Sequence, residues 1–432
     1  MGISRRINYQ RMSELNQNFK NSLVDKVNKN KELLVDLTSR LVQIPSESPE
    51  SDTRQMVKEI ADFLEQIDGV EISFHTLEEP ITNIVARIKG KNPGKRLILN
   101  GHLDTYPAGN ESLWTHHPFS GHEENGRMYG RGVSDMKGGI ASYLVTFMIM
   151  AEMRDSWSGE LVITLAGDEE TMGVKGTKYL LDTVPHASGD AMISGDAGAS
   201  KVLRFGEKGL MWIGLNAIGK ASHGAHVHKG ENAIDRLVEG IDRMNKELVS
   251  LKVNAPKEVT QAIKESSEIS ERYSGEGETE VLQRVTVNFG TIEGGVSPNL
   301  IPAKASAQGD IRVPVGVSMS EVEQKIKEIT ESVEGLSYHI FRQYEPNRSD
   351  INHEIFVFTA DNVEYITGEK PVNTMRVGAS DARHYRISKN IPSVNCGLNP
   401  YNLGGPDEYI EIEELTDLAK IHTLTAFDYL SE

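Results

Sequence analysis

Amphipathic stretches alternate with short apolar runs along the amino-terminal half of the chain. Apolar positions that recur with helical spacing predict two helices, over residues 30–42 and 53–67. Apolar runs of strand length predict strands between and after them, over 70–74, 83–88, 96–100, 161–166 and 191–193. This alternation indicates an α/β fold, in which a mixed sheet forms a layer with helices on both faces.

A different pattern begins at residue 210. Strand-like and helix-like stretches follow in the order strand, helix, strand, strand, helix, over 210–217, 232–248, 285–292, 303–313 and 318–334. Between the first helix and the second strand, residues 257–277 are polar and charged, and we expect them to form a mobile excursion. The pattern predicts an inserted α+β unit of ferredoxin-like type over 210–329, within a larger domain of residues 1–209 and 330–432.

Composition limits the class of protein and its partners. The chain has 432 residues, of which 38% are hydrophobic and 25% charged, which is ordinary for a globular protein of two domains. A net charge of -17 argues against nucleic acid or an anionic membrane as the main partner. Residues 1–19 are polar and no run approaches a membrane span, so we expect a cytoplasmic protein. The single cysteine, Cys396, excludes an intrachain disulfide and a cysteine-rich zinc site.

Three of the predicted strands end on histidine or acidic residues. His102 and Asp104 follow the strand at 96–100, and two further strands run into Asp168-Glu169-Glu170 and Asp196. A glycine-rich loop over 130–139 carries one more acid, Asp135. Strand ends meet at one edge of an open α/β sheet, where several carboxylates cannot all stay ionised without a cation. The pattern therefore predicts a divalent metal centre.

The order of these motifs, followed by Ser222-His223 and Gly230-x-Asn232-Ala233-Ile234, closely resembles the M20 family of metallopeptidases and deacylases. The resemblance spans residues 30–430. It implies a metal-dependent hydrolase that cleaves an amide C–N bond in an N-acyl amino acid or a short peptide. The implied substrate is a small molecule with a carboxylate, and the implied assembly is a homodimer formed through the inserted domain.

The same resemblance implies a role for each acidic residue and histidine of the site. His102 and Asp196 would be the terminal ligands of one metal ion, and Asp135 would bridge it to a second ion that Glu170 also binds. Imidazole and carboxylate ligands fit zinc best, and cobalt or manganese would also fit. Asp104 would orient the His102 ring by accepting its other N–H.

The remaining catalytic roles fall to Glu169 and His223. By resemblance, Glu169 would be the general base that takes a proton from the attacking water and returns it to the leaving nitrogen. His223 would reach the active site of a partner subunit and hold the oxyanion.

Several further residues resemble the substrate-facing positions of the family. Asn299 lies in the segment 297–302, and Arg312 would either clamp a substrate carboxylate or form a structural ion pair. Ser380 and His384 lie in a loop that resembles the family's segment beside the substrate, and Tyr401 lies near the carboxyl-terminal motif.

One departure concerns the last metal ligand of the family, a histidine shortly before a Pro-Asp/Asn-Glu motif. In this chain Gly404 stands at that place, ahead of Pro406-Asp407-Glu408. Three alternatives remain open: an unusual ligand such as Tyr401 or His384, or water, completes a metal pair; the enzyme uses one ion; or catalysis is lost. Two functions compete with amide hydrolysis, namely deamination or other cleavage of a non-peptide C–N bond, and binding without catalysis.

Overall fold

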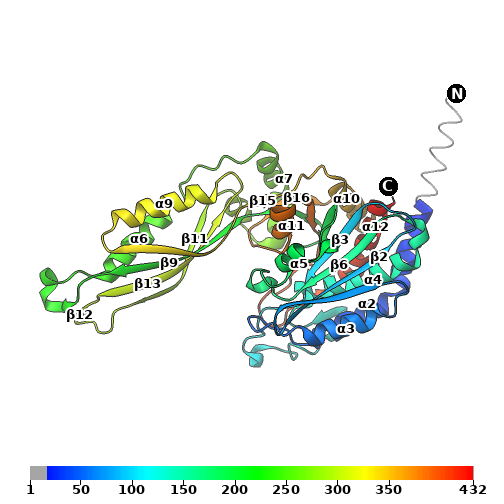
Figure 1. The fold of residues 1–432 in the computed structure, drawn as a ribbon, viewed down its shortest axis with the longest axis horizontal. Helices are drawn as coiled ribbons and strands as arrows, with labels where there is room; N and C mark the ends of the chain where they lie inside the picture. The colour runs from blue at the N-terminus through cyan, green and yellow to red at the C-terminus, as the bar shows by residue number, and fades with distance from the viewer. Residues whose placement is uncertain (1–16, 432) are drawn as a thin grey trace. The chain divides into compact units, whose positions relative to one another are not determined.

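A computed structural model describes residues 17–431 of the chain, which form two compact units (Figure 1). Among these residues, the first unit comprises 17–205, 349–372 and 380–431, and the second comprises Gly206–Arg348 and Asn373–Ala379. The second unit therefore extends beyond the expected limit at residue 329, because the strand β14 (Leu336–Tyr344) pairs with β9 (Gly209–Ile218). Residues 1–16, which contributed to the expectation of a cytoplasmic protein, lie outside the described residues.

The first unit contains all of the elements expected from the amino-terminal pattern. Its helices are a segment over 17–29, α2 (Lys31–Val42), α3 (Arg54–Leu64), α4 (Gly138–Glu152), α5 (Thr177–Thr183), α10 (Glu354–Thr367), α11 (Ala382–Lys389) and α12 (Ile412–Leu430). Its strands are β1 (Glu71–Glu78), β2 (Ile81–Lys89), β3 (Arg96–His102), β4 (His122–Glu124), β5 (Arg127–Tyr129), β6 (Glu160–Ala166), β7 (Ala191–Ser194), β17 (Ser393–Asn395) and β18 (Tyr409–Glu411), with β8 (Val202–Glu207), β15 (Asn347–Arg348) and β16 (Val372–Arg376) next to the boundary between the units.

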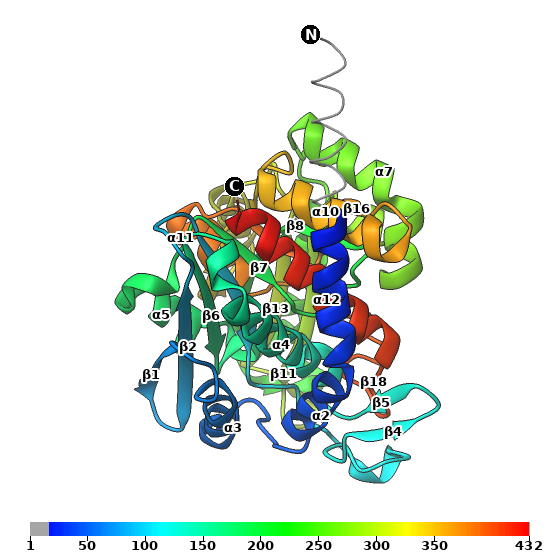
Figure 2. The same ribbon diagram turned by 90° about the vertical axis from the view of Figure 1, so that its right-hand side faces the viewer.

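A mixed sheet forms the layer that positions the candidate site. Its strands run in the order β1-β2-β6-β3-β7-β17-β8-β15, with β16 also paired to β8. The central strand β3 is parallel to both of its neighbours, β6 and β7. One face packs against α5 and α11 through Ile98, Val162, Leu180 and Tyr385. Helices α4 and α12 cover the other face, so the sheet is buried on both sides, as expected (Figure 2).

The second unit is an antiparallel sheet in the order β11-β13-β9-β14, with helices α6 and α9 against it (Figure 1). Its apolar core lies between the sheet and these helices. Besides β9 and β14, the elements are β10 (Ser222–His223), α6 (Ala233–Glu247), α7 (Lys257–Ser274), α8 (Glu278–Val281), β11 (Thr286–Gly294), β12 (Leu300–Ile301), β13 (Lys304–Val313) and α9 (Met319–Ser332). The predicted α+β class of this unit is confirmed.

The expectation of a mobile excursion over 257–277 is wrong, because most of this stretch forms the helix α7. Its buried positions are Val259, Ala262, Ile263, Ser266 and Ser270, which recur with helical spacing. Two of these positions are serines, and Ser266 donates its hydroxyl hydrogen to the main-chain oxygen of Ile263 at 3.0 Å. Because serines occupy part of the buried side of the helix, the sequence shows no continuous apolar stripe.

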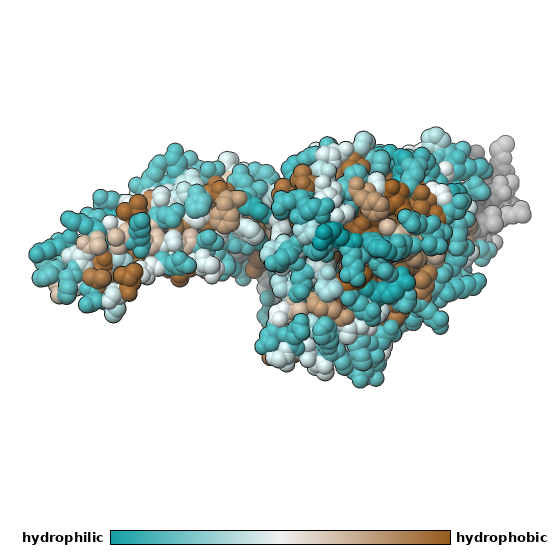
Figure 3. Space-filling view, turned by 60° about the horizontal axis from the view of Figure 1, so that its bottom comes forward, coloured by the Kyte–Doolittle hydropathy of each residue, from teal (hydrophilic) through white to brown (hydrophobic). Residues whose placement is uncertain are grey.

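No helix within residues 17–431 is long and apolar enough to cross a bilayer. The face of the molecule in Figure 3 is mostly hydrophilic, with separate hydrophobic patches.

Candidate metal centre and active site

The strand ends that carry the predicted residues lie side by side in the sheet. In the register of the parallel strands, His102 at the end of β3 lies opposite Ala166, and Asn100 lies opposite Ser194. The acidic residues 168–170 follow β6 directly, and Asp196 follows β7. The expectation that these strands deliver their polar residues to one edge of the sheet is confirmed by this register.

A buried group of three side chains forms the core of the candidate centre. One ligand atom each from His102, Asp135 and Glu170 lies within 4.8 Å of the others. The Nε2 atom of His102 lies 3.0 Å from Oδ1 of Asp135. On the far side of the ring, Nδ1–H donates to the main-chain oxygen of Asp104 at 2.9 Å. This hydrogen bond leaves Nε2 as the ring nitrogen that faces the acids and could bind a metal.

The charge balance of the group fits a divalent cation. Burial, together with repulsion from Asp135 and Glu169, raises the pKa of Glu170 to about 10. Its Oε1 atom is buried and has no hydrogen-bond partner. Burial opposes the charged imidazole, but Asp104 and Asp135 raise the pKa of His102 well above its ordinary value. A divalent ion would satisfy the orphaned oxygen and the excess negative charge, and one imidazole with carboxylates suits zinc, cobalt or manganese.

Asp104 is placed differently from the expectation. Its carboxylate lies 3.6 Å from Nδ1 of His102, while its own main-chain oxygen accepts the ring hydrogen at 2.9 Å. The carboxylate instead accepts the main-chain N–H groups of Glu169 and Glu170, each at 3.0 Å. Asp104 is fully buried and therefore fixes the turn that carries both glutamates.

Glu169 lies beside the ligand group but is not part of it. Its side chain is almost completely buried, and Nη1 of Arg383 lies 3.7 Å from its Oε1. Burial raises the pKa of Glu169; His102 and Arg383 oppose this shift, while Asp381 and Asp196 add to it. A carboxyl with a raised pKa beside a metal-binding group is suited to accept and return a proton near neutral pH.

The loop that carries Asp135 is held by a buried ion pair that sequence reasoning missed. Nη1 of Arg131 lies 2.5 Å from Oε2 of Glu408, and both side chains are about 1% exposed. The Glu408 carboxylate also accepts the N–H and the hydroxyl of Ser134 at 3.1 and 2.8 Å, and the N–H of Gly132 at 3.3 Å. The sequence marks Glu408 only as the last residue of the Pro406-Asp407-Glu408 motif, and no local pattern indicates that its carboxylate binds the loop over 131–134.

Asp196 is buried, but its carboxylate is not part of the group of His102, Asp135 and Glu170, whose ligand atoms lie within 4.8 Å of one another. Its charge acts on Glu169, which places it at the same edge of the sheet. Its backbone oxygen accepts a hydrogen bond from Nδ2 of Asn395 at 2.8 Å. Its role as a ligand stays a prediction.

Gly404 lies in a loop with open space around its α-carbon. A Cβ atom at this position would meet no atom within 4 Å, and the backbone has a φ of 73°, which favours glycine. The main-chain oxygens of Gly404 and Gly405 accept hydrogen bonds from Nη2 of Arg131 at 3.0 and 3.1 Å. The loop is therefore tied to the one that carries Asp135 without supplying a side-chain ligand of its own at this position.

Neither proposed replacement ligand belongs to the metal-binding group among the described residues. The Tyr401 hydroxyl donates to Oε1 of Glu414 at 3.0 Å, and burial together with Glu414 raises the pKa of Tyr401 to about 12. Burial and Arg383 hold the pKa of His384 well below its usual value, so the ring is neutral. Its Nε2–H donates to the main-chain oxygen of Met172 at 3.2 Å. Both side chains are thus engaged elsewhere. Ser380, in the same loop as His384, is buried, and its main-chain oxygen accepts a hydrogen bond from the N–H of Arg383.

The other predicted residues belong to the second unit. His223 is exposed, and its Nδ1 accepts the N–H of Ala225 at 3.1 Å. Asn299 is also exposed. Arg312 is paired with Asp310 on the same face of β13, at 2.9 Å, as the structural alternative predicted. Its Nη1 atom is buried without a hydrogen-bond partner.

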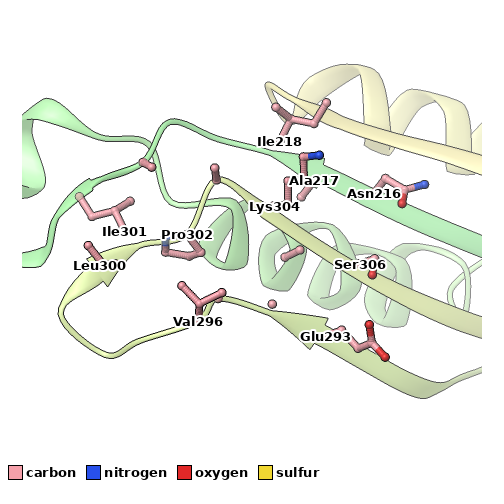
Figure 4. Close-up of a pocket in the computed structure, with 15 residues that line it drawn as sticks. Asn216, Ala217, Ile218, Glu293, Val296, Leu300, Ile301, Pro302, Lys304 and Ser306 are labelled. Atoms are coloured by element: carbon pink, nitrogen blue, oxygen red, sulfur yellow. The ribbon is translucent and has the colours of Figure 1, made fainter.

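A pocket of about 750 Å³ lies at one end of the second unit (Figure 4). Leu300, Ile301 and Pro302 line it, together with the ends of β9, β11 and β13. It contains none of the predicted metal ligands, so the candidate reaction centre is the buried group in the first unit.

A mixed α/β sheet with an inserted antiparallel unit, and with a buried histidine and carboxylates at the ends of parallel strands, is an arrangement typical of metal-dependent hydrolases. Residues 98–428 match the family described as peptidase family M20/M25/M40, and the chain belongs to this family. It is therefore a metallopeptidase or amidohydrolase of the M20 type.

The individual relatives share less than a third of their residues with this chain. The chain is 28% identical over 376 residues to a succinyl-diaminopimelate desuccinylase of Rhodospirillum centenum, which covers 82% of this chain and 88% of that protein. Its fold is similar to that of an M20 family metallo-carboxypeptidase from Sulfolobus solfataricus, with a TM-score of 0.75, 20% identity, and coverage of 92% of this chain and 99% of that one. A dinuclear metal-binding M20 peptidase from Bacillus subtilis aligns with a TM-score of 0.66 and 16% identity over 93% of this chain and 99% of that one.

Proposed function

We propose that the chain hydrolyses the amide bond of a substrate that carries a free carboxylate, either an N-acyl amino acid or a short peptide. The observation that carries this proposal is the buried group of His102, Asp135 and Glu170, with Glu169 beside it. The desuccinylase relative supports a substrate in which an acyl group is attached to an amino acid nitrogen.

His102, Asp135 and Glu170 would hold the metal, with Asp196 as a further ligand. When bound, the metal would polarise the substrate carbonyl and lower the pKa of the attacking water. Glu169 takes one proton from this water as the new C–O bond forms. It then delivers the proton to the amide nitrogen as the C–N bond breaks, so that an amine and a carboxylic acid result. Asp104 keeps Glu169 and Glu170 in place through their main-chain N–H groups.

A substrate panel combined with metal removal tests this proposal. We expect hydrolysis of at least one N-succinyl or N-acetyl amino acid or dipeptide, loss of that activity after chelation, and recovery on adding Zn²⁺, Co²⁺ or Mn²⁺. The readout is release of the free amine. Turnover of an amino-substituted ring with no turnover of any amide would instead support deamination. Metal-replete protein without any turnover would support a binding protein.

The number of ions at the centre is part of the same proposal. Gly404 offers no side chain, and Tyr401 and His384 have other partners, so we infer that protein ligands hold one ion firmly and that water completes the coordination of any second ion. Elemental analysis of the wild-type chain and of His102→Ala measures this number, because the difference in bound metal per chain between the two is the number of ions at this centre.

We also propose that the chain forms a homodimer in which His223 acts in the active site of the partner subunit. His223→Ala and Glu169→Gln should each be inactive alone. After subunit exchange, a mixture of the two should regain about a quarter of the wild-type activity, because half of the dimers are mixed and each has one complete site. Subunit exchange, followed with differently tagged chains, that yields no activity above the parent variants would refute the shared site.

A further inference from the structure

A second group of side chains that could bind a metal lies outside the candidate active site. His116, His122 and Glu124 each offer a ligand atom within 4.8 Å of the others. The Nε2 atom of His116 lies 3.7 Å from Oε2 of Glu124. The rings of His116 and His122 are stacked, with centroids 3.8 Å apart and planes at 22°. None of these residues takes part in the proposed hydrolysis.

The local backbone directs two of these side chains to the same place. His122 and Glu124 occupy alternate positions of β4, and alternate side chains of a strand point to the same face. Antiparallel pairing with β5 holds this strand, with His122 opposite Tyr129. Glu123, between the two, points to the other face. The sequence His122-x-Glu124 therefore presents an imidazole and a carboxylate together.

His116 reaches the same place from a loop that is fixed on both sides. Thr115 donates its N–H and hydroxyl hydrogens to the carboxylate of Asp407 at 2.7 and 2.8 Å. Two residues after His116, the main-chain oxygen of Pro118 accepts the N–H of Arg131 at 2.7 Å. The ring of Tyr129, 5.3 Å from that of His116, packs beside it. His116 is half-buried and does not depend on a mobile segment to reach His122.

We propose that His116, His122 and Glu124 bind a first-row divalent transition metal, for which Zn²⁺ is the reference ion. Two imidazoles and one carboxylate form a ligand set that zinc accepts. Ligand atoms of a tetrahedral site lie about 3.3 Å apart, and the 3.7 Å between Nε2 of His116 and Oε2 of Glu124 is close to this separation. The bound ion links the loop around His116 to the β4–β5 hairpin. With three protein ligands, at least one position of the ion stays open to water.

Zinc content of full-length variants after dialysis tests this site. In a His102→Ala background, which weakens the candidate active site, the chain should retain one equivalent of zinc that is lost when His116→Ala is added. In the otherwise wild-type chain, Glu124→Gln should lower zinc content while leaving amide hydrolysis unchanged. This exposed, conservative substitution keeps the test valid where the histidine variant fails to fold.

Two matched controls lie next to the ligands. His117→Ala removes an exposed imidazole that faces Glu111 at 3.8 Å, and Glu123→Gln changes the opposite face of β4. Both should keep the wild-type zinc content. Equal zinc content in Glu124→Gln and Glu123→Gln, and in His116→Ala and His117→Ala, would overturn the proposal. Neither outcome depends on whether the chain hydrolyses amides, because zinc content is measured directly.

Discussion

Glu169→Gln should lower kcat by a factor of about 100 to 10,000 while the protein keeps its metal. Glutamine has nearly the same shape as glutamate but cannot accept and return a proton, and general acid–base catalysis contributes a factor of this size. The substitution leaves the ligand group unchanged, because Glu169 lies beside His102, Asp135 and Glu170 and is not one of them. Steady-state kinetics on the best substrate and elemental analysis of the same preparation measure the two quantities.

The adjacent residue provides the matched control. Glu170→Gln makes the same chemical change one position later, at a carboxylate of the ligand group, and we expect it to lower metal affinity. Activity of Glu170→Gln should then recover in part at high metal concentration, whereas that of Glu169→Gln should not. A Glu169→Gln protein with wild-type kcat, or one that loses metal like Glu170→Gln, would contradict the assignment of the base.

The edge of the sheet could be predicted from the sequence because strand ends carry their own signal. The apolar runs that end at His102, Asp168 and Asp196 became β3, β6 and β7, which are neighbours in the sheet. Parallel strands that are neighbours must present their carboxyl ends at one edge. The order of the three strands, with β3 between β6 and β7, could not be predicted and comes from the structure alone.

The two longest elements of the second unit that were not predicted, α7 and β14, were missed for different physical reasons. In α7 the buried stripe includes two serines, of which Ser266 donates to its own helix and Ser270 to Glu278 of α8, so the apolar periodicity was too weak to recognise. In β14 polar and apolar residues alternate, with the odd-numbered positions exposed over most of the strand, but the strand follows helix α9 without a clear boundary. Pairing with β9 makes it part of the sheet.

Contacts between distant segments account for what sequence reasoning missed at the site. Asp104 resembles a residue that orients His102, but its carboxylate binds the turn after β6. Arg383 reaches Glu169 from α11, more than two hundred positions away in the sequence. No local pattern encodes such contacts, because each depends on how the strands and helices are ordered in the sheet.

The strongest effect on stability is expected from Glu408→Ala. Its carboxylate is paired with Arg131 and accepts hydrogen bonds from Gly132 and Ser134, all in a buried region. Removing one partner of a buried ion pair leaves the other charge without compensation, which costs about 3–5 kcal/mol. We expect a decrease of this size in the free energy of unfolding of the metal-free protein, measured by urea denaturation.

The same substitution should weaken metal binding, although Glu408 is not a ligand. The segment that Glu408 holds, 131–134, leads directly into Asp135, so a loosened loop no longer keeps the Asp135 carboxylate 3.0 Å from His102. The control is Glu411→Ala, which removes a glutamate three residues later from a half-exposed pair with Arg127. Because water screens that pair, the control should change stability and metal affinity much less. Equal losses in both variants would mean that Glu408 acts only through the general stability of the segment around β18. A loss of metal affinity confined to Glu408→Ala would identify it as the residue that positions Asp135.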